Sequence, residues 1–568
     1  MKFFLLCSFL LLTTVLFAQN RFDIIIEELM ADPSPQVGLP ANEWIELKNT
    51  SNAAINLQGW RVGDGSGQSG AMPSFSLAPD SFVIVCTGSA VAAMSAFGTV
   101  ISVTSFPSLD NDGEQLYLKA PNGQVIHSLL YTSAWYQNEI KKDGGWSLEM
   151  IDTHNPCNGF NNWKASINPA GGTPGKINSV NAANPDVTAP SIKNVYAANA
   201  NVIVLEFDES VDSVSAATPA NYSVSNNMVL LNAETISPVF NEVHITTATP
   251  LVENTAYTIT VSNLKDCIGN NLASSGPIKF GLASATGTSD LVINEILFNP
   301  RSGAYDYIEI YNRSNKIADA SKLFLANRGS NGTIGSAVAL ASTTFTLFPG
   351  EYLVATEDAA SLALNYLVEK PADVLTVNTL PSFPDEEGFV VLLNQQGDVI
   401  DEVHYFDDWH FKLLDNKEGV SLERLDPGVG SQEAANWHSA ASTAGYGTPG
   451  YKNSQVLSTQ STTSRIEVSP KVFSPDNDGF NDIAIVRYSM DQPGYVANIT
   501  IFDAAGRPVR NLVRNGTLAL NGSWNWDGLD DKGLKLAVGT YIIFTEVFNL
   551  SGKKERFKNT LVLARKLR

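Results

Sequence analysis

The chain has 568 residues, enough for about three to five domains at roughly 100–200 residues each. A hydrophobic fraction of 44% excludes broad disorder, and a charged fraction of 17% argues against coiled coils and long solvated helices. The formal net charge of −21 repels phosphate backbones, which disfavours nucleic acid as a general partner and suits an extracellular protein that holds cations.

The start of the chain has the pattern of a secretory signal. Met1 and Lys2 give a short positive start, residues 3–17 are apolar, and Ala18 offers a small residue for cleavage. The apolar run is shorter than the ~20 residues of a membrane-spanning helix, and no comparable run follows. We therefore expect a signal peptide at residues 1–18, no transmembrane span, and an exported protein that is extracellular or on the outer cell surface.

Two stretches of the chain repeat the same motifs in the same order. The first carries IEELMADP at 26–33, EWIELKN at 43–49, NW at 162–163 and GTPG at 172–175; the second carries INEILFNP at 293–300, DYIEIYN at 306–312, NW at 436–437 and GTPG at 447–450. These motifs resemble the lamin tail domain as it occurs in exported bacterial proteins. The resemblance implies immunoglobulin-like sandwiches at residues 19–182 and 289–455.

The segment between the two copies resembles another family. VLEFDESVD at 204–212, AYTITV at 256–261 and DCIGN at 266–270 are similar to steps of the bacterial Ig-like domain known from S-layer proteins. The resemblance implies a spacer sandwich at residues 186–284. Two short stretches, 91–97 and 359–366, are predicted to be helical, while runs rich in β-branched and aromatic residues predict strands elsewhere.

A linker rich in Ser, Thr and Gln at 456–464 precedes the last predicted domain, residues 465–568. That domain resembles the Ig-like domain of flagellar hook-capping proteins and the C-terminal domains that address Bacteroidetes proteins to type IX secretion. The resemblance implies the secretion machinery as a partner; the alternative is a fourth structural sandwich. The expected fold class is therefore all-β, a string of immunoglobulin-like β-sandwich domains.

The strongest chemical signal is the acidic loop near the start of this last domain. Asp476, Asp478 and Asp482 would supply carboxylates and Phe480 a carbonyl oxygen, and calcium prefers several oxygens from a flexible loop. Calcium is therefore the one expected cofactor. The alternative is a tight turn in which Asp side chains bond their own backbone.

The cysteines predict one disulfide in the first lamin-tail-like copy. Cys86 lies in an apolar strand and Cys157 lies late in the same copy, and the second copy has no cysteine. Joint presence in one copy and joint absence in the other is expected of a bonded pair. We predict a Cys86–Cys157 bond, which leaves Cys267 unpaired.

Four glutamates recur at matching places: Glu28 and Glu46 in the first copy, Glu295 and Glu309 in the second. Two carboxylates on neighbouring strands could form an acid/base pair. They could equally accept hydrogen bonds from backbone groups, and their recurrence in both copies favours this framework role.

No segment is left over for a catalytic domain. We therefore expect a structural or adhesive protein without catalytic activity, whose partners are envelope or matrix polymers or proteins. The alternative is an exported module that binds polysaccharide or nucleic acid, and a hydrolase accessory protein is less favoured. Trp135 and Trp409 could stack on a glycan, although nothing else in the sequence supports a carbohydrate site.

Overall fold

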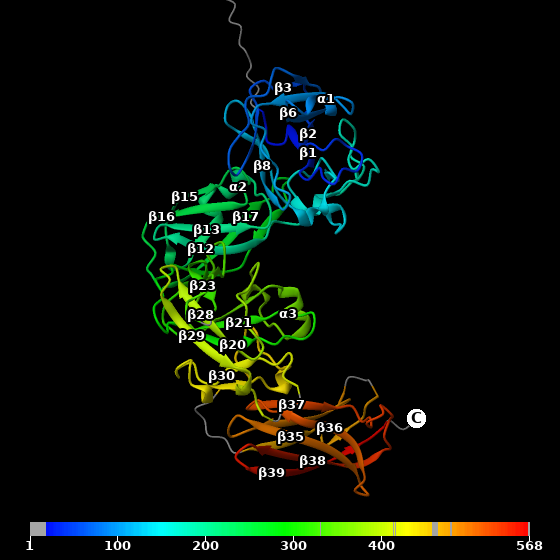
Figure 1. Cartoon of the computed structure of the whole chain (residues 1–568), viewed down its shortest axis with the longest axis vertical. Helices are drawn as coiled ribbons and strands as arrows, with labels where there is room; N and C mark the ends of the chain where they lie inside the picture. Colours follow the sequence, from blue (N-terminus) through cyan, green and yellow to red (C-terminus); the bar gives the residue numbers. More distant parts are fainter. Residues whose placement is uncertain are drawn as a thin grey trace, which may run out of the picture. The chain divides into compact units, whose positions relative to one another are not determined.

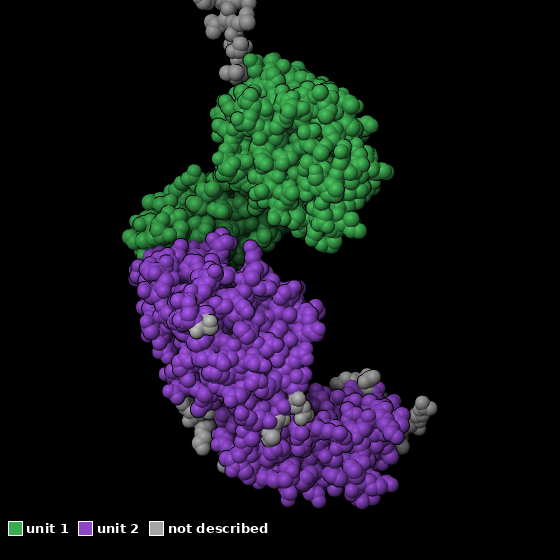
Figure 2. All heavy atoms as spheres, viewed as in Figure 1, with its two compact units in different colours: residues 1–251, 256–280 green, residues 252–255, 281–568 purple. Residues whose placement is uncertain are grey.

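The computed structural model describes residues 19–329, 331–412, 414, 416–456, 464–476 and 480–565. Strands dominate, and the α-helices among these residues are α1 (Val91–Met94), α2 (Ser213–Ala216) and α3 (Ala359–Asn365) (Figure 1). Helices α1 and α3 confirm the two predicted helical stretches. The chain forms two compact units, residues 1–251 with 256–280 and residues 252–255 with 281–568 (Figure 2).

The first lamin-tail-like copy is a sandwich around one apolar core. Its larger sheet has the order β11 (Trp163–Ala165), β10 (Leu148–Met150), β1 (Ile24–Met30), β2 (Trp44–Asn49), β6 (Phe82–Thr87), β7 (Val100–Val103). The facing sheet has the order β4 (Arg61–Asp64), β8 (Gly113–Lys119), β9 (Val125–Thr132), and β3 (Ile55–Asn56) pairs with β5 (Ser76–Leu77). Strands β1 and β2 are buried almost throughout, and the buried residues include Glu27, Glu28 and Glu46.

The second copy repeats this topology. Its larger sheet has the order β31 (Trp437–Ser439), β30 (Leu422–Arg424), β20 (Leu291–Leu297), β21 (Tyr307–Asn312), β26 (Tyr352–Thr356), β27 (Val374–Thr376). The facing sheet has the order β24 (Val338–Ala339), β23 (Leu323–Ala326), β28 (Glu387–Asn394), β29 (Val399–Phe406), and β22 (Ala318–Asp319) pairs with β25 (Thr346–Leu347). The internal repeat predicted from sequence is confirmed.

Even the irregularities of the two larger sheets coincide. The pairing of β1 with β2 shifts register between Ile26 and Glu28, and that of β20 with β21 shifts between Ile293 and Glu295. A bulge redirects the side chains that follow it. Both copies thereby place a glutamate directly opposite a second glutamate on the neighbouring strand, Glu28 opposite Glu46 and Glu295 opposite Glu309.

The Ig-like segment between the copies also has two sheets. One has the order β12 (Ile192–Asn199), β13 (Val202–Phe207), β16 (Glu242–Thr247), β15 (Leu230–Thr235). The other has the order β14 (Tyr222–Val224), β17 (Ala256–Lys265), β18 (Asn271–Ser274), with β19 (Ile278–Gly281) also pairing with β17. Strand β17 alternates buried and exposed residues, as expected where one face of a sheet meets the core.

The C-terminal domain is a further sandwich. One sheet has the order β32 (Arg465–Ser469), β34 (Ala484–Ser489), β37 (Asn521–Trp526); the other has the order β33 (Val472–Phe473), β39 (Lys554–Leu563), β38 (Gly539–Asn549), β35 (Tyr495–Asp503), β36 (Pro508–Thr517). The all-β fold class is confirmed. None of the helices in the described part of the chain has the length and hydrophobicity needed to cross a bilayer. The predicted signal peptide, residues 1–18, and positions 457–463 of the predicted linker lie outside the described residues.

Candidate functional site

Each lamin-tail-like copy buries three glutamates side by side. In the first copy Glu28 on β1 lies opposite Glu46 on β2 and opposite Glu149 on β10, and all three side chains are inaccessible to solvent. In the second copy the equivalent residues are Glu295, Glu309 and Glu423, which are also buried. Buried carboxyl groups are costly unless their oxygens accept hydrogen bonds, so their partners indicate their role.

In the first copy the partners come from the GTPG segment. The backbone N–H of Thr173 donates to Glu28 Oε1 (2.7 Å), its hydroxyl donates to Glu149 Oε1 (2.8 Å), and the N–H of Gly175 donates to Glu46 Oε1 (2.5 Å). All three glutamates therefore hold one short loop against three adjacent strands.

The second copy repeats these bonds. The N–H of Thr448 donates to Glu295 Oε1 (2.9 Å), its hydroxyl donates to Glu423 Oε1 (2.9 Å), and the N–H of Gly450 donates to Glu309 Oε2 (2.6 Å). The recurrent glutamates thus anchor the loop in both copies, as the framework interpretation expects. The third member, Glu149 in the first copy and Glu423 in the second, was not predicted to belong to this set, although the motif Ser-Leu-Glu stands at matching places in both copies.

Burial makes the contribution of these carboxyl groups to the free energy of unfolding depend on pH. It raises the pKa of Glu46 to about 10, and the neighbouring carboxylates of Glu28 and Glu27 add to the shift. In the unfolded chain the same group ionises near pH 4.5. Between these values the folded chain binds more protons than the unfolded chain, so the free energy of unfolding falls as pH rises.

We expect Glu46→Gln to make this decline between pH 4.5 and 10 shallower, because glutamine cannot ionise. The measurement is urea unfolding of the first lamin-tail-like copy across that range, in the chain that begins at Gln19. The control is Glu139→Gln in the same copy, at a side chain that is 86% exposed. Equal slopes in the wild type and the Glu46→Gln variant would contradict the prediction.

The two copies use different side chains to accept a hydrogen bond from the backbone N–H of equivalent residues, Ile26 and Ile293. In the first, Nδ1 of buried His127 accepts a hydrogen bond from the N–H of Ile26 (2.9 Å), and its Nε2 lies 3.1 Å from the carbonyl of Pro156. Burial lowers the pKa of His127 to about 4, so the ring is neutral and Nε2 donates. Met150, on the adjacent sheet, is apolar and buried.

In the second copy, Asp401 takes the place of His127 and accepts from the N–H of Ile293 (2.8 Å). Arg424, on β30 at the position of Met150, has no exposed side-chain surface and pairs with Asp401 (3.1 Å). Its guanidinium also donates to the carbonyls of Ile293 (2.8 Å) and Val429 (3.0 Å). His127 and Met150 of the first copy are therefore neutral, whereas Asp401 and Arg424, at the equivalent positions of the second copy, form a buried ion pair.

The predicted Cys86–Cys157 bond is wrong. Cys157 is bonded to Cys267, 110 positions later, with the two Cα atoms 6.5 Å apart. The bond joins the first lamin-tail-like copy to the Ig-like segment. Cys86 is the free cysteine of these three; it lies on β6 within an apolar cluster with Trp44 and Ile84, and burial raises the pKa of its thiol to about 11. Cys267, predicted to be unpaired, is therefore the second half of the bridge.

Part of the predicted calcium loop is described. The backbone N–H of Asp476 donates to Asp482 Oδ1 (3.1 Å), which closes a turn, and the ring of Phe480 is 73% exposed. Asp478 lies outside the described residues. Calcium at this loop stays a prediction.

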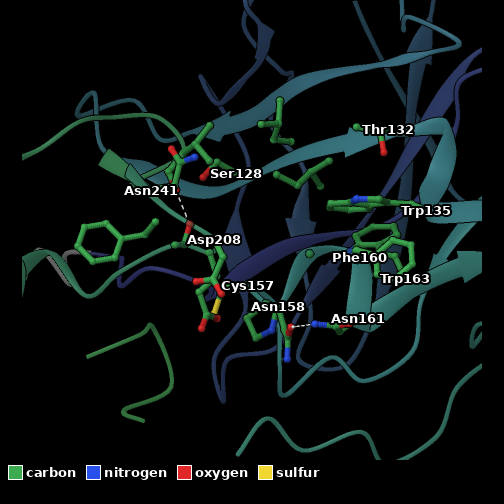
Figure 3. A pocket seen from close by; sticks show the side chains of 18 of the residues that line it. Ser128, Thr132, Trp135, Cys157, Asn158, Phe160, Asn161, Trp163, Asp208 and Asn241 are labelled. Carbon is green, nitrogen blue, oxygen red and sulfur yellow. Dashed lines mark hydrogen bonds between the residues drawn. The ribbon is translucent and has the colours of Figure 1, made fainter. Parts of the chain in front are cut away.

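A pocket of about 370 Å³ lies beside the disulfide (Figure 3). Trp135, Phe160 and Trp163 gather on one side of it, and Asp208 and Asn241 lie on another. The rings of Trp135 and Trp163 are 5.8 Å apart, and Trp163 belongs to the core. Among the described residues that line the pocket there is no histidine and no free thiol. The lining thus offers aromatic surface and hydrogen-bonding groups, which a ligand could contact.

Fold and site together define a multidomain protein of β-sandwich modules. Residues 18–133 and 284–407 match the family model of the Lamin Tail Domain, and residues 179–281 match that of the Bacterial Ig-like domain. The chain therefore contains two lamin tail domains with a bacterial Ig-like domain between them. Strands β10 and β30 complete the two larger sheets from beyond the matched residues. No curated protein matches the chain in sequence.

Several solved structures resemble parts of the chain. The N-terminal part of the bacterial S-layer protein SbsC is 15% identical, with 28% of this chain and 44% of that one aligned at a TM-score of 0.17. PorZ, a surface component of the type IX secretion system of Porphyromonas gingivalis, is 9% identical over 93% and 81% of the two chains (TM-score 0.16). The adhesin InvE of Yersinia pseudotuberculosis is 12% identical over 44% and 73% (TM-score 0.15).

The chain spans less than half the length of that SbsC structure. TM-scores of this size carry no conclusion about function.

Proposed function

We propose that this protein is an exported structural or adhesive component of the cell surface or its surrounding matrix. The observation that carries the proposal is the disulfide between Cys157 and Cys267, which crosses from one sandwich module to the next. Disulfides persist in oxidising compartments outside the cytosol, and a covalent bridge between modules stiffens a tandem array. Residues 1–18 have the sequence of a signal peptide, which agrees with export.

Hydrogen bonds join modules in the second unit as well. The N–H and hydroxyl of Ser442 bond the hydroxyl and carbonyl of Thr517 (2.9 and 2.7 Å), and Gln455 Nε2 donates to the carbonyl of Leu518 (3.1 Å). These contacts tie the second lamin tail domain to the C-terminal domain. Resistance to bending is useful in a scaffold and offers no advantage to a freely diffusing binding module.

The test is cell fractionation combined with protease shaving of intact producing cells. We expect the protein to be in the surface or extracellular fraction, with the 157–267 bridge oxidised. A gene deletion should weaken cell cohesion or attachment to a surface. A cytoplasmic protein with reduced cysteines would contradict export, and unchanged cohesion would contradict the structural role.

The C-terminal domain is proposed to act as the address for secretion, with the secretion machinery as its partner. Its terminal position and the preceding linker support this role, because a translocon can engage the last module while the others stay folded. Deleting residues 466–568 should then trap a folded protein in the periplasm. Normal surface delivery of the truncated chain would leave this domain a structural module.

A polysaccharide ligand is the second candidate, and the aromatic pocket beside the disulfide favours it. Phe160 is 49% exposed there, so a sugar ring could stack on it. A glycan array in which the wild type binds and Phe160→Ala does not would support this function, and an array without binding would reject it.

A further inference from the structure

Three acidic side chains meet at one end of the Ig-like domain. Asp186 precedes β12, Glu209 follows β13, and Asp266 follows β17 directly and pairs with Val211 in an isolated bridge. One oxygen from each carboxylate lies within 4.8 Å of the other two. The residues are up to 80 positions apart (266 − 186 = 80), so the fold, not a local turn, brings them together.

Asp266 is held in place by its own loop. It is 1% exposed, and its Oδ1 accepts the backbone N–H groups of Gly269 (2.6 Å) and Asn270 (2.8 Å). Asn270 Nδ2 donates to Asp266 Oδ2 (2.7 Å) and to the carbonyl of Asp186 (3.3 Å). The loop therefore positions one carboxylate and also fixes the backbone that carries the second.

The other two carboxylates each keep an oxygen without a hydrogen-bond donor. Asp186 is 8% exposed; its Oδ1 accepts from the N–H and hydroxyl of Thr188, while its Oδ2 is buried with no partner. Glu209 Oε2 is buried and without a partner as well. Buried carboxylate oxygens in native proteins are normally satisfied, so two unsatisfied ones in one cluster indicate that something else binds there.

The charges in the cluster oppose one another. Within the described part of the chain, no lysine or arginine forms an ion pair with any of the three clustered carboxylates. A divalent cation bound among the three carboxylates would balance their charge.

We propose that Asp186, Glu209 and Asp266 form a calcium site. Calcium takes oxygen ligands at about 2.3–2.6 Å, so two oxygens on opposite sides of one ion lie up to roughly 5 Å apart, which the observed separations allow. Magnesium demands a tighter shell at about 2.0–2.1 Å and keeps several waters, which fits this open arrangement less well.

The site would act on the junction between two domains. Asp186 belongs to the segment that leads from the first lamin tail domain into the Ig-like domain, and Asp266 is the neighbour of disulfide-bonded Cys267. A bound ion would clamp that segment to the end of the sandwich beside the covalent bridge. Calcium would thus control the stiffness of this junction.

The experiment uses the chain from Gln19 onward with Asp476→Asn and Asp482→Asn throughout, so that the C-terminal loop cannot contribute. Calcium binding is measured by equilibrium dialysis, and thermal unfolding is followed in calcium chloride and in EDTA. The test variant is Glu209→Gln. The control is Glu242→Gln, which removes the same charge from a partly exposed residue of the same domain.

We expect one calcium ion per chain in the background protein and in the Glu242→Gln control, and none in the Glu209→Gln variant. Calcium should raise the melting temperature of the first two proteins only. In EDTA the Glu209→Gln variant should melt at or above the background temperature, because it loses an ionisable group that lies beside two other carboxylates. Equal calcium binding by the Glu209→Gln variant, no binding by the background protein, or a lower melting temperature of the variant in EDTA would each overturn the proposal.

Discussion

Replacing Arg424 by methionine is expected to destabilise the second lamin tail domain by about 3–5 kcal/mol. The substitution leaves Asp401 buried without its partner and removes the guanidinium donors that satisfy the carbonyls of Ile293 and Val429. The cost is that of an uncompensated buried charge. Hydrogen exchange of strands β20 and β30 in the otherwise complete chain measures the change in local unfolding free energy.

The first lamin tail domain supplies the rescue variant. Adding Asp401→His to Arg424→Met recreates the neutral combination of His127 and Met150, so most of the lost stability should return. Arg328→Met is the matched control, since it breaks a partly exposed pair with Glu402 and should cost at most about 1 kcal/mol. A double variant as unstable as the single one would show that the two copies are not interchangeable at these positions.

Removing the bridge with Cys157→Ser and Cys267→Ser together should be the other large effect. In the chain-entropy model, opening a loop of 110 residues costs about 4–5 kcal/mol in the free energy of unfolding. Urea unfolding of the first unit, with and without the substitutions, measures it.

Thiol labelling in denaturant without reductant tests the pairing itself. We expect a label on Cys86 and none on Cys157 or Cys267. A label on Cys267 with protection of Cys86 would restore the pairing that the sequence predicts and contradict the one described here.

The repeat, the sandwich folds and the short helices could be predicted because they depend on local patterns. Motifs such as EWIELKN and GTPG are contiguous, and both copies carry them. The framework role of Glu28 and Glu46 followed from recurrence alone. Recurrence could not identify the GTPG loop as the donor of hydrogen bonds to these glutamates, because Thr173 lies 145 positions from Glu28.

The prediction of a Cys86–Cys157 bond was wrong for a physical reason. The absence of cysteine from the second copy fits a bond within the first copy, but it fits equally a bond from the first copy to its neighbour. Cys86 lies on β6, inside a sheet, and is buried in an apolar cluster with Trp44 and Ile84. Cys157 lies in the connection between β10 and β11, and its sulfur meets that of Cys267 in the Ig-like segment.

The acidic cluster was missed because its members are dispersed. Glu209 and Asp266 stand in the two motifs that suggested the Ig-like family, FDES and DCIGN, and Asp186 stands at the start of the Ig-like segment, outside both motifs. Nothing in the spacing of these residues indicates convergence. The bridge between Val211 and Asp266 brings the two motifs to one edge.

The bridge between Cys157 and Cys267 also determines how the molecule would carry tension. A load applied to the two ends of the chain enters the bond at residue 157 and leaves it at residue 267, bypassing the backbone in between. Most of the Ig-like domain is therefore shielded from extension while the bond is intact. After reduction, unfolding of the bridged segment under load would lengthen the chain by roughly 400 Å, so the bond limits how far this part of the molecule can extend.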